Sequence, residues 1–129
     1  MFAWGRIKNM QNYISKLKCL GDETRIRILK VIIEAEVELC VCEIVASLDM
    51  PFYTISKHIK ELKNAKILSE TKEGKFVMYS LTERKDDFLD KIIALINSIP
   101  NEYFKDNLDL LKKRLSLRDN GKCVLGIKN

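Results

Sequence analysis

The chain has 129 residues, of which 47% are hydrophobic and 32% charged, and its net charge is +5. This length and composition suit one globular domain that buries its own core without disulfides, and they exclude a low-complexity chain. No apolar run approaches the length of a membrane span, and the N-terminus lacks a signal-peptide pattern. We therefore expect a cytoplasmic protein with no membrane partner.

Two amphipathic helices are predicted at the start of the chain. Apolar residues recur at helical spacing between residues 7 and 20, and Gly21 ends that helix. Asp22 is a suitable N-cap for the second helix, because its short carboxylate can accept a hydrogen bond from the first turn. The second helix is apolar over a broad arc, which predicts a central place in the core.

A helix-turn-helix is predicted next. A short helix is expected from Leu39 or Cys40 to Leu48, and Pro51 breaks the chain after it, because proline disfavours helical geometry in the preceding residue. The following helix, over residues 52–65, has a narrow apolar face and an exposed basic face. Two short helices joined by a tight turn are typical of DNA-binding proteins in which the second helix reads the bases. The predicted buried positions of this reading helix are Ile55, Ile59 and Leu62.

Residues 67–82 change to a strand pattern. Aromatic and β-branched residues follow Glu73 and Gly74, which predicts a β-hairpin whose tip carries Lys72 and Lys75. A hairpin directly after a helix-turn-helix is a wing.

Two more helices are predicted after the wing. An apolar stripe begins after Arg84 and stops at Pro100, and we expect it to form a dimer seam with the first helix rather than intramolecular core. This stripe consists of Leu89, Ile92, Ile93, Ile96 and Ile99. A last helix precedes Asn120 and Gly121, which loosen the chain before Cys123. The expected fold is thus mainly α with a small β-hairpin, a dimeric winged helix-turn-helix. Residues 1–100 form its DNA-binding and dimerisation domain, and residues 101–129 form a C-terminal helix and a Cys-containing tail.

The cysteines indicate a site for a soft ion. Thiols in the cytosol stay reduced, so these residues are better candidates for metal ligands than for structural disulfides. Cys40 and Cys42 are one residue apart, and positions i and i+2 of a regular helix point in nearly opposite directions. They can share one ion only if the start of the helix is distorted or not yet helical. A helix N-terminus favours thiolates, and thiolates select soft ions over Mg or Ca.

The order of these motifs resembles the ArsR/SmtB family of winged helix-turn-helix metal-sensing repressors. The matching segments are residues 20–29 (LGDETRIRIL), 38–44 (ELCVCEI), 55–62 (ISKHIKEL) and 73–81 (EGKFVMYSL). The resemblance implies a homodimer that binds palindromic double-stranded operator DNA in its ion-free form, represses a metal(loid)-resistance operon and is released by its ligand. The family also has a second site of Asp, His and Glu on the last helix. Because His58 is the only histidine, that site is not recognisable here, which argues against a zinc-type sensor.

The resemblance also frames the choice of inducer. Arsenic-sensing relatives often carry a third Cys three residues after the pair, where this chain has Val45. We therefore expect Cys123, rather than Cys19, to join Cys40 and Cys42 as the third thiolate, in the same or the other subunit. Three thiolates suit As(III) or Sb(III), and four, with Cys19 recruited, would suit Cd, Pb or Zn. A thiol redox switch is a further alternative.

The DNA face is predicted from the reading helix and the wing. The side chains expected to contact phosphates are Lys57, Lys60, Lys63, Lys72 and Lys75. The side chains expected to read bases are Tyr53, Thr54 and Ser56, with Lys57 or His58 as further candidates. A structural role for His58 is equally compatible with the sequence. The operator sequence cannot be borrowed from relatives, because residues 51–53 differ from theirs. An enzyme is not expected, since there is no Cys-x-x-Cys, Gly-rich phosphate loop or catalytic triad.

Overall fold

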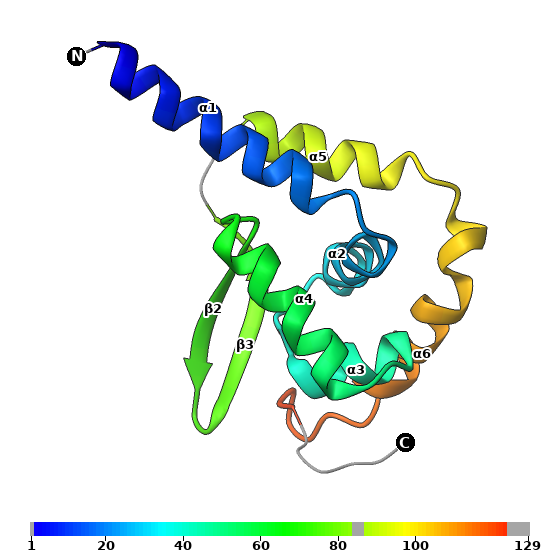
Figure 1. Ribbon diagram of the computed structural model, residues 1–129. Coiled ribbons are helices and arrows are strands. Elements are labelled where there is room, and N and C mark those ends of the chain that lie inside the picture. Colours follow the sequence, from blue (N-terminus) through cyan, green and yellow to red (C-terminus); the bar gives the residue numbers. More distant parts are fainter. Residues whose placement is uncertain (1, 84–86, 124–129) are drawn as a thin grey trace.

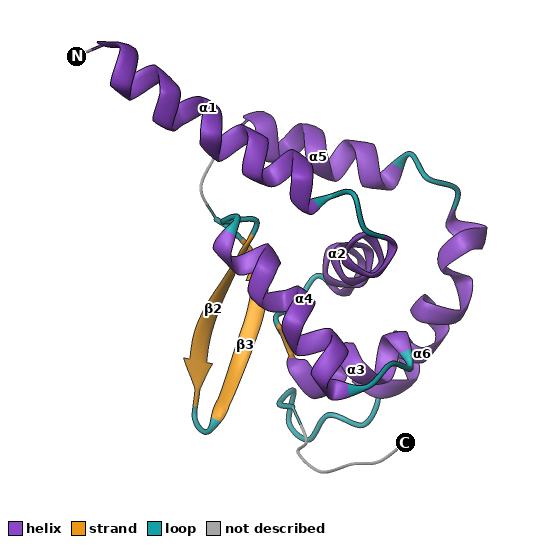
Figure 2. Cartoon of the chain, in the orientation of Figure 1, coloured by secondary structure: helices purple, strands orange, loops and turns teal. Residues whose placement is uncertain are grey.

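The protein is described by a computed structural model that covers residues 2–83 and 87–123, with side chains from residue 10 onward. All predicted helices and the hairpin are present; Arg84, where the fifth helix was expected to begin, lies outside the described residues. The elements, shown in Figures 1 and 2, are α1 (Phe2–Cys19), α2 (Glu23–Ala35), β1 (Leu39–Cys40), α3 (Val41–Leu48), α4 (Phe52–Asn64), β2 (Leu68–Glu73), β3 (Phe76–Leu81), α5 (Asp87–Asn97), the 3-10 turn η1 (Asn101–Phe104) and α6 (Lys105–Leu115).

The helix-turn-helix consists of α3 and α4. Asp49 ends α3 in the left-handed conformation, with φ of 54°, and its amide donates to the Val45 carbonyl. Pro51 then caps α4, a place where its missing N–H costs nothing. The buried residues of α4 are Ile55, Ile59 and Leu62, as its helical spacing predicts. The same spacing turns the lysines of α4 toward solvent.

The sheet has one strand more than the sequence predicts. Its order is β1-β3-β2, all antiparallel, with Leu39 opposite Tyr79 and Cys40 opposite Met78. The prediction that α3 begins at Leu39 or Cys40 is therefore wrong. Both residues are buried and their backbone is paired with the wing, so the helix starts one residue later. Gly74 makes the hairpin turn with φ of 64°, a conformation glycine adopts without strain.

The core is built around α2, which is seen end-on between the other helices in Figure 1. Asp22 caps this helix as predicted, and its carboxylate accepts from the Arg25 amide. The apolar stripe of α5 also packs into this core: Leu89, Ile92 and Ile96 are at most 5% exposed. Their assignment to a dimer seam is therefore wrong, because they are already buried within one chain. Among the side chains of α1 and α5 that the structure describes, the large apolar ones left exposed are Met10, Tyr13, Leu17 and Leu95.

Helix α6 packs against α3 and α2, and Leu111 lies in the same core cluster as the residues of α2 and α4. We predict that Leu111→Ala lowers the free energy of unfolding by about 2–5 kcal/mol, because it leaves a cavity in a packed core. Leu117→Ala is the control: Leu117 is 44% exposed, and its loss should change stability by less than about 0.5 kcal/mol. Urea unfolding followed by circular dichroism measures both. A separate early transition for α6 in the parent protein would contradict a shared core.

Over the residues that the structure describes, no helix combines the length and apolar character needed to cross a membrane.

Candidate metal centre and nucleic-acid interface

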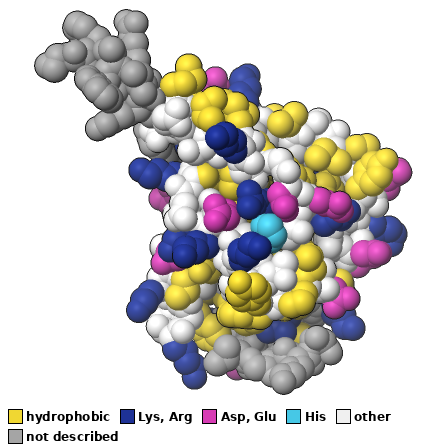
Figure 3. Space-filling model, in the orientation of Figure 1, with side chains coloured by type: hydrophobic (Ala, Val, Ile, Leu, Met, Phe, Trp, Pro, Cys, Tyr) yellow, Lys and Arg dark blue, Asp and Glu magenta, His cyan; other side chains and the backbone are white. Residues whose placement is uncertain are grey.

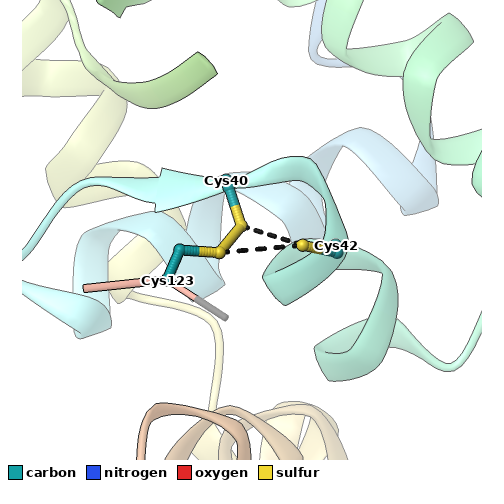
Figure 4. Close-up of side chains that lie close together, drawn as sticks. All are labelled: Cys40, Cys42 and Cys123. Atoms are coloured by element: carbon teal, nitrogen blue, oxygen red, sulfur yellow. Dashed lines mark hydrogen bonds between the residues drawn. A yellow bond between two sulfur atoms is a disulfide. The ribbon is translucent and has the colours of Figure 1, made fainter. Parts of the chain in front are cut away.

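Three cysteines meet where β1 joins α3 (Figure 4). Cys40 and Cys123 are joined by a disulfide. The Cys42 Sγ lies 3.0 Å from the Cys40 Sγ and 3.7 Å from the Cys123 Sγ. Within the described part of the chain, this is the group of three ligand-type side chains whose donor atoms fall within 4.8 Å of one another. Cys40 and Cys123 are buried, whereas Cys42 is half-buried.

The sulfur atoms of Cys40 and Cys42 meet because Cys40 is not helical. It is the N-cap of α3, with φ of −85° and ψ of 166°, while Cys42 lies in the first turn. An extended residue followed by a helix start rotates the second side chain toward the first, which a continuous helix would not do. The condition for a shared ion, a helix start that is not yet helical, is met at Cys40.

Cys123 is brought in by a tight turn rather than by a loose tail. Asn120 and Gly121 have φ of 56° and 74°, and Asp119 and Lys122 exchange two backbone hydrogen bonds of 3.1 and 3.0 Å. Asn and Gly are the residues that most readily adopt these left-handed angles. The prediction of a loosened chain before Cys123 is therefore wrong for the described residues, and the structure brings the predicted trio together.

The donor set suits a soft ion. Sulfur atoms that each lie about 2.3 Å from one shared ion are about 3–4 Å apart, and the two separations from Cys42 are in that range. Ligation needs thiolates, so the Cys40–Cys123 disulfide must be reduced before all three sulfurs can bind. In the reduced protein, the three sulfur donors favour soft ions over Mg or Ca.

Cys19 stands apart from this group. It is 5% exposed in the main core at the end of α1, and its carbonyl accepts from the Arg25 guanidinium. Burial raises the pKa of the Cys19 thiol, against a smaller lowering by Arg25. A raised pKa disfavours the thiolate that an ion requires.

The raised pKa of Cys19 predicts slow alkylation. In a variant in which Cys40, Cys42 and Cys123 are all Ser, Cys19 should react with iodoacetamide much more slowly than in urea, because only the thiolate attacks. Its native rate should keep rising above pH 9.0, the ordinary value of a thiol. Mass spectrometry of timed samples measures this. Equal rates in native and urea-unfolded protein would contradict the burial of this thiol.

The predicted DNA face is exposed. Tyr53 near the start of α4 is 77% exposed, Thr54 and Ser56 are half-buried, and all the lysines assigned to phosphate contacts are exposed: Lys57, Lys60, Lys63, Lys72 and Lys75. Lys63 also pairs with Glu70 of the wing at 3.1 Å. Figure 3 shows basic side chains over α4 and the hairpin, interspersed with acidic ones.

His58 is engaged within the protein. Its side chain is 12% exposed, and its Nδ1 accepts a 3.0 Å hydrogen bond from the Arg25 Nε. The Asp22 carboxylate lies 3.9 Å away. These contacts tie α4 to the start of α2, so the geometry favours the structural role of His58 over a base contact.

One open groove of about 650 Å³ connects the cysteines to the DNA face. Cys40 and Cys42 lie on one wall, Ser56 and Lys60 of α4 on another, and Tyr79 of the wing on a third. The cysteines therefore lie beside both of the elements that are predicted to contact DNA, α4 and the hairpin.

The comparisons with known proteins agree with this arrangement. The family model described as "Bacterial regulatory protein, arsR family" matches residues 22–70. The arsenic resistance transcriptional regulator ArsR1 of Pseudomonas putida is 33% identical over 92 residues, which cover 71% of each chain. This chain belongs to the arsR family. Members of this family are DNA-binding transcriptional regulators.

Two further matches extend the comparison. A Staphylococcus aureus protein described as a homolog of the cadmium resistance transcriptional regulatory protein CadC is 38% identical over 76 residues, 59% of this chain and 62% of that protein. A homodimeric winged helix-turn-helix domain from Mycobacterium bovis has a TM-score of 0.62 and 20% identity, covering 78% of this chain and 88% of that one. The winged helix-turn-helix fold is thus shared, and both arsenic and cadmium regulators are among the relatives.

Sequence reasoning missed Glu43 and Arg118, which surround the cysteines. Glu43 is fully buried, and its Oε1 accepts from the Cys40 amide at 3.1 Å, as in a capping box. A Glu three residues after an N-cap is a recognisable pattern, although here Cys takes the place of Ser or Thr. Arg118 lies 75 residues after Glu43 in the chain, and nothing in the sequence indicates that the two residues pair.

Proposed function

We propose that this protein is a homodimeric repressor of a metal(loid)-resistance operon that leaves its operator when As(III) or Sb(III) binds Cys40, Cys42 and Cys123. The observation that carries the proposal is the meeting of three sulfur atoms at the β1–α3 junction. Three thiols can displace the three hydroxyl groups of arsenous acid as three molecules of water, leaving one As(III) held by three sulfurs.

The ion site is coupled to DNA through its own elements. Cys40 is paired with Met78 of the wing strand β3, and Cys42 is in the first turn of α3, which packs against α4. Reduced Cys40 and Cys123 are free to separate, and convergence of all three thiolates on one ion redirects the start of α3. Because α3 carries the turn that sets α4, the reading helix and the wing lose the spacing that fits the operator.

A homodimer follows from the surface that remains apolar. Met10, Tyr13 and Leu17 of α1 and Leu95 of α5 are between 40% and 59% exposed, and α1 runs beside α5, where Tyr13 contacts Phe88 edge-on at 4.9 Å. An apolar surface of this kind is typical of an interface. Two copies related by a two-fold axis would present two reading helices to a palindromic operator.

The test is release from DNA. Reduced protein bound to its own upstream promoter fragment is titrated with arsenite, antimonite, Cd, Pb and Zn while fluorescence anisotropy reports the complex. We expect arsenite and antimonite to release the DNA. Release by Cd or Pb alone, with a requirement for Cys19, would instead identify a four-thiolate sensor.

A redox regulator is the second candidate, because the structure joins Cys40 to Cys123. In that case a mild oxidant such as diamide would release the reduced, ion-free protein from DNA, and dithiothreitol would restore binding. If no ion releases the DNA and the oxidant does, the redox function replaces the ion sensor.

A further inference from the structure

The guanidinium of Arg118 lies at the junction of the segments that supply the three thiols. Its Nε and Nη2 donate to the two carboxylate oxygens of Glu43, each at 2.8 Å. Nη2 also donates to the Glu38 carbonyl at 2.6 Å, and Nη1 to the Gly121 carbonyl at 3.2 Å. Such a planar fork matches a carboxylate in a way that the single ammonium of lysine cannot.

Each of these contacts leads to a cysteine. Glu43 holds the Cys40 amide through its Oε1 and is the residue after Cys42. Glu38 lies two residues before Cys40, and Gly121 lies two residues before Cys123. The Glu43 side chain is 1% exposed and that of Arg118 is 13% exposed, so the pair is shielded from water. The hydrogen bonds from Arg118 to Glu43 hold the pKa of Arg118 above its ordinary value.

We propose that Arg118 is a positioning residue that holds Cys123 against Cys40 and Cys42 and thereby sets the affinity of the thiol site for its ion. The effect of Arg118 on ion affinity rests on the proposed function. The placement of Cys123 by Arg118 rests on the hydrogen bonds alone. Partners that orient a ligand in this way commonly account for about 10–100-fold in ion affinity.

The test variant is Glu43→Gln with Arg118→Met. Removing Arg118 alone would leave a buried, unpaired carboxylate and could unfold the protein. The double variant removes both charges of this pair, keeps the net charge of the chain, and retains an amide oxygen for the Cys40 N–H, as in a capping box with Gln. The control is Lys105→Met with Asp109→Asn, which neutralises an exposed pair of opposite charges on α6, away from the cysteines.

The placement of Cys123 is measured without any ion. In a background of Cys19→Ser and Cys42→Ser, oxidised glutathione converts the Cys40 and Cys123 thiols to one disulfide and is itself reduced to two molecules of glutathione. Trapping by alkylation gives the effective concentration of one thiol at the other. We expect a fall of at least about tenfold in the test variant, toward the millimolar values of a flexible linker, and no change in the control. An unchanged effective concentration would overturn the proposal.

The ion part is measured by release from DNA with Cys42 restored. The arsenite concentration for half-release should rise about 10–100-fold in the test variant. In a Cys123→Ser background, adding the test variant should not raise the half-release concentration further, because both changes act on the same contact of Cys123 with the site. Equal half-release concentrations in parent and test variant would overturn the role of Arg118 in ion binding. If the parent protein itself is not released by arsenite while the effective concentration falls as expected, the proposed function fails and the positioning role stands.

Discussion

Replacing Cys42 by Ser is expected to weaken arsenite-induced release from the operator by more than about 100-fold, because losing a ligand should cost more than losing a residue that merely orients one. A serine hydroxyl is a hard, protonated donor that does not replace a thiolate for a soft ion. The Cys42 Sγ lies 3.0 Å from the Cys40 Sγ and 3.7 Å from the Cys123 Sγ, and its removal leaves two thiolates for an ion that needs three. Fluorescence anisotropy of the protein–promoter complex, titrated with arsenite in a reducing buffer, gives the half-release concentrations.

Cys19→Ser is the matched control for this experiment. It removes a thiol of the same chain that lies in the main core, away from the cluster. We expect it to leave the half-release concentration unchanged. Ion-free Cys42→Ser should still bind the promoter, since the side chain has no predicted contact with DNA. Release of Cys42→Ser at the arsenite concentration that releases the parent would contradict the three-thiolate site.

The second large effect concerns DNA. Replacing Lys72 and Lys75 by Gln is expected to reduce operator affinity and to make its salt dependence shallower. Each lost phosphate contact should reduce the slope of log affinity against log salt by about 0.9. Both side chains are exposed at the hairpin tip, where a wing can follow the backbone of the duplex. Anisotropy titrations at several salt concentrations give the slope.

The control for the wing removes the same charge elsewhere. Lys112 and Lys113 are exposed in the last turn of α6, outside the reading helix and the hairpin. Replacing both by Gln changes the net charge equally, so any difference between the two variants reports contact rather than overall charge. Equal slopes for the two variants would contradict a phosphate-binding wing.

The regular elements could be predicted because their periods are long and consistent. The thirteen residues of α4 place Ile55, Ile59 and Leu62 on one face, and a Gly between two β-rich runs marks the hairpin. By contrast, β1 has two residues, too few to show a period, and its strand geometry comes from pairing with Tyr79 and Met78. The local signal for a helix start at Cys40 was therefore overridden by the sheet.

The thiol chemistry of the site could be predicted from the sequence, but the contacts that position its cysteines could not. Two cysteines one residue apart, in a segment resembling a sensor motif, indicated a thiol site, and Cys123 was a candidate by its residue type. The place of its turn beside the other two cysteines was not anticipated, because the contact of Arg118 with Glu43 joins residues far apart in the chain. Likewise, periodicity identifies the apolar face of α5 but does not say whether that face meets its own core or a second subunit. The burial of Leu89, Ile92 and Ile96 decides that for three positions.

The most direct test of the three-thiolate site is arsenic X-ray absorption spectroscopy of the reduced protein loaded with one equivalent of arsenite. We predict three sulfur neighbours and no oxygen neighbour for each arsenic in the parent protein, and the same result in Cys19→Ser. Cys123→Ser should show two sulfurs and one oxygen. Two sulfurs in the parent protein, or a spectrum that changes with Cys19→Ser and not with Cys123→Ser, would contradict the proposed site.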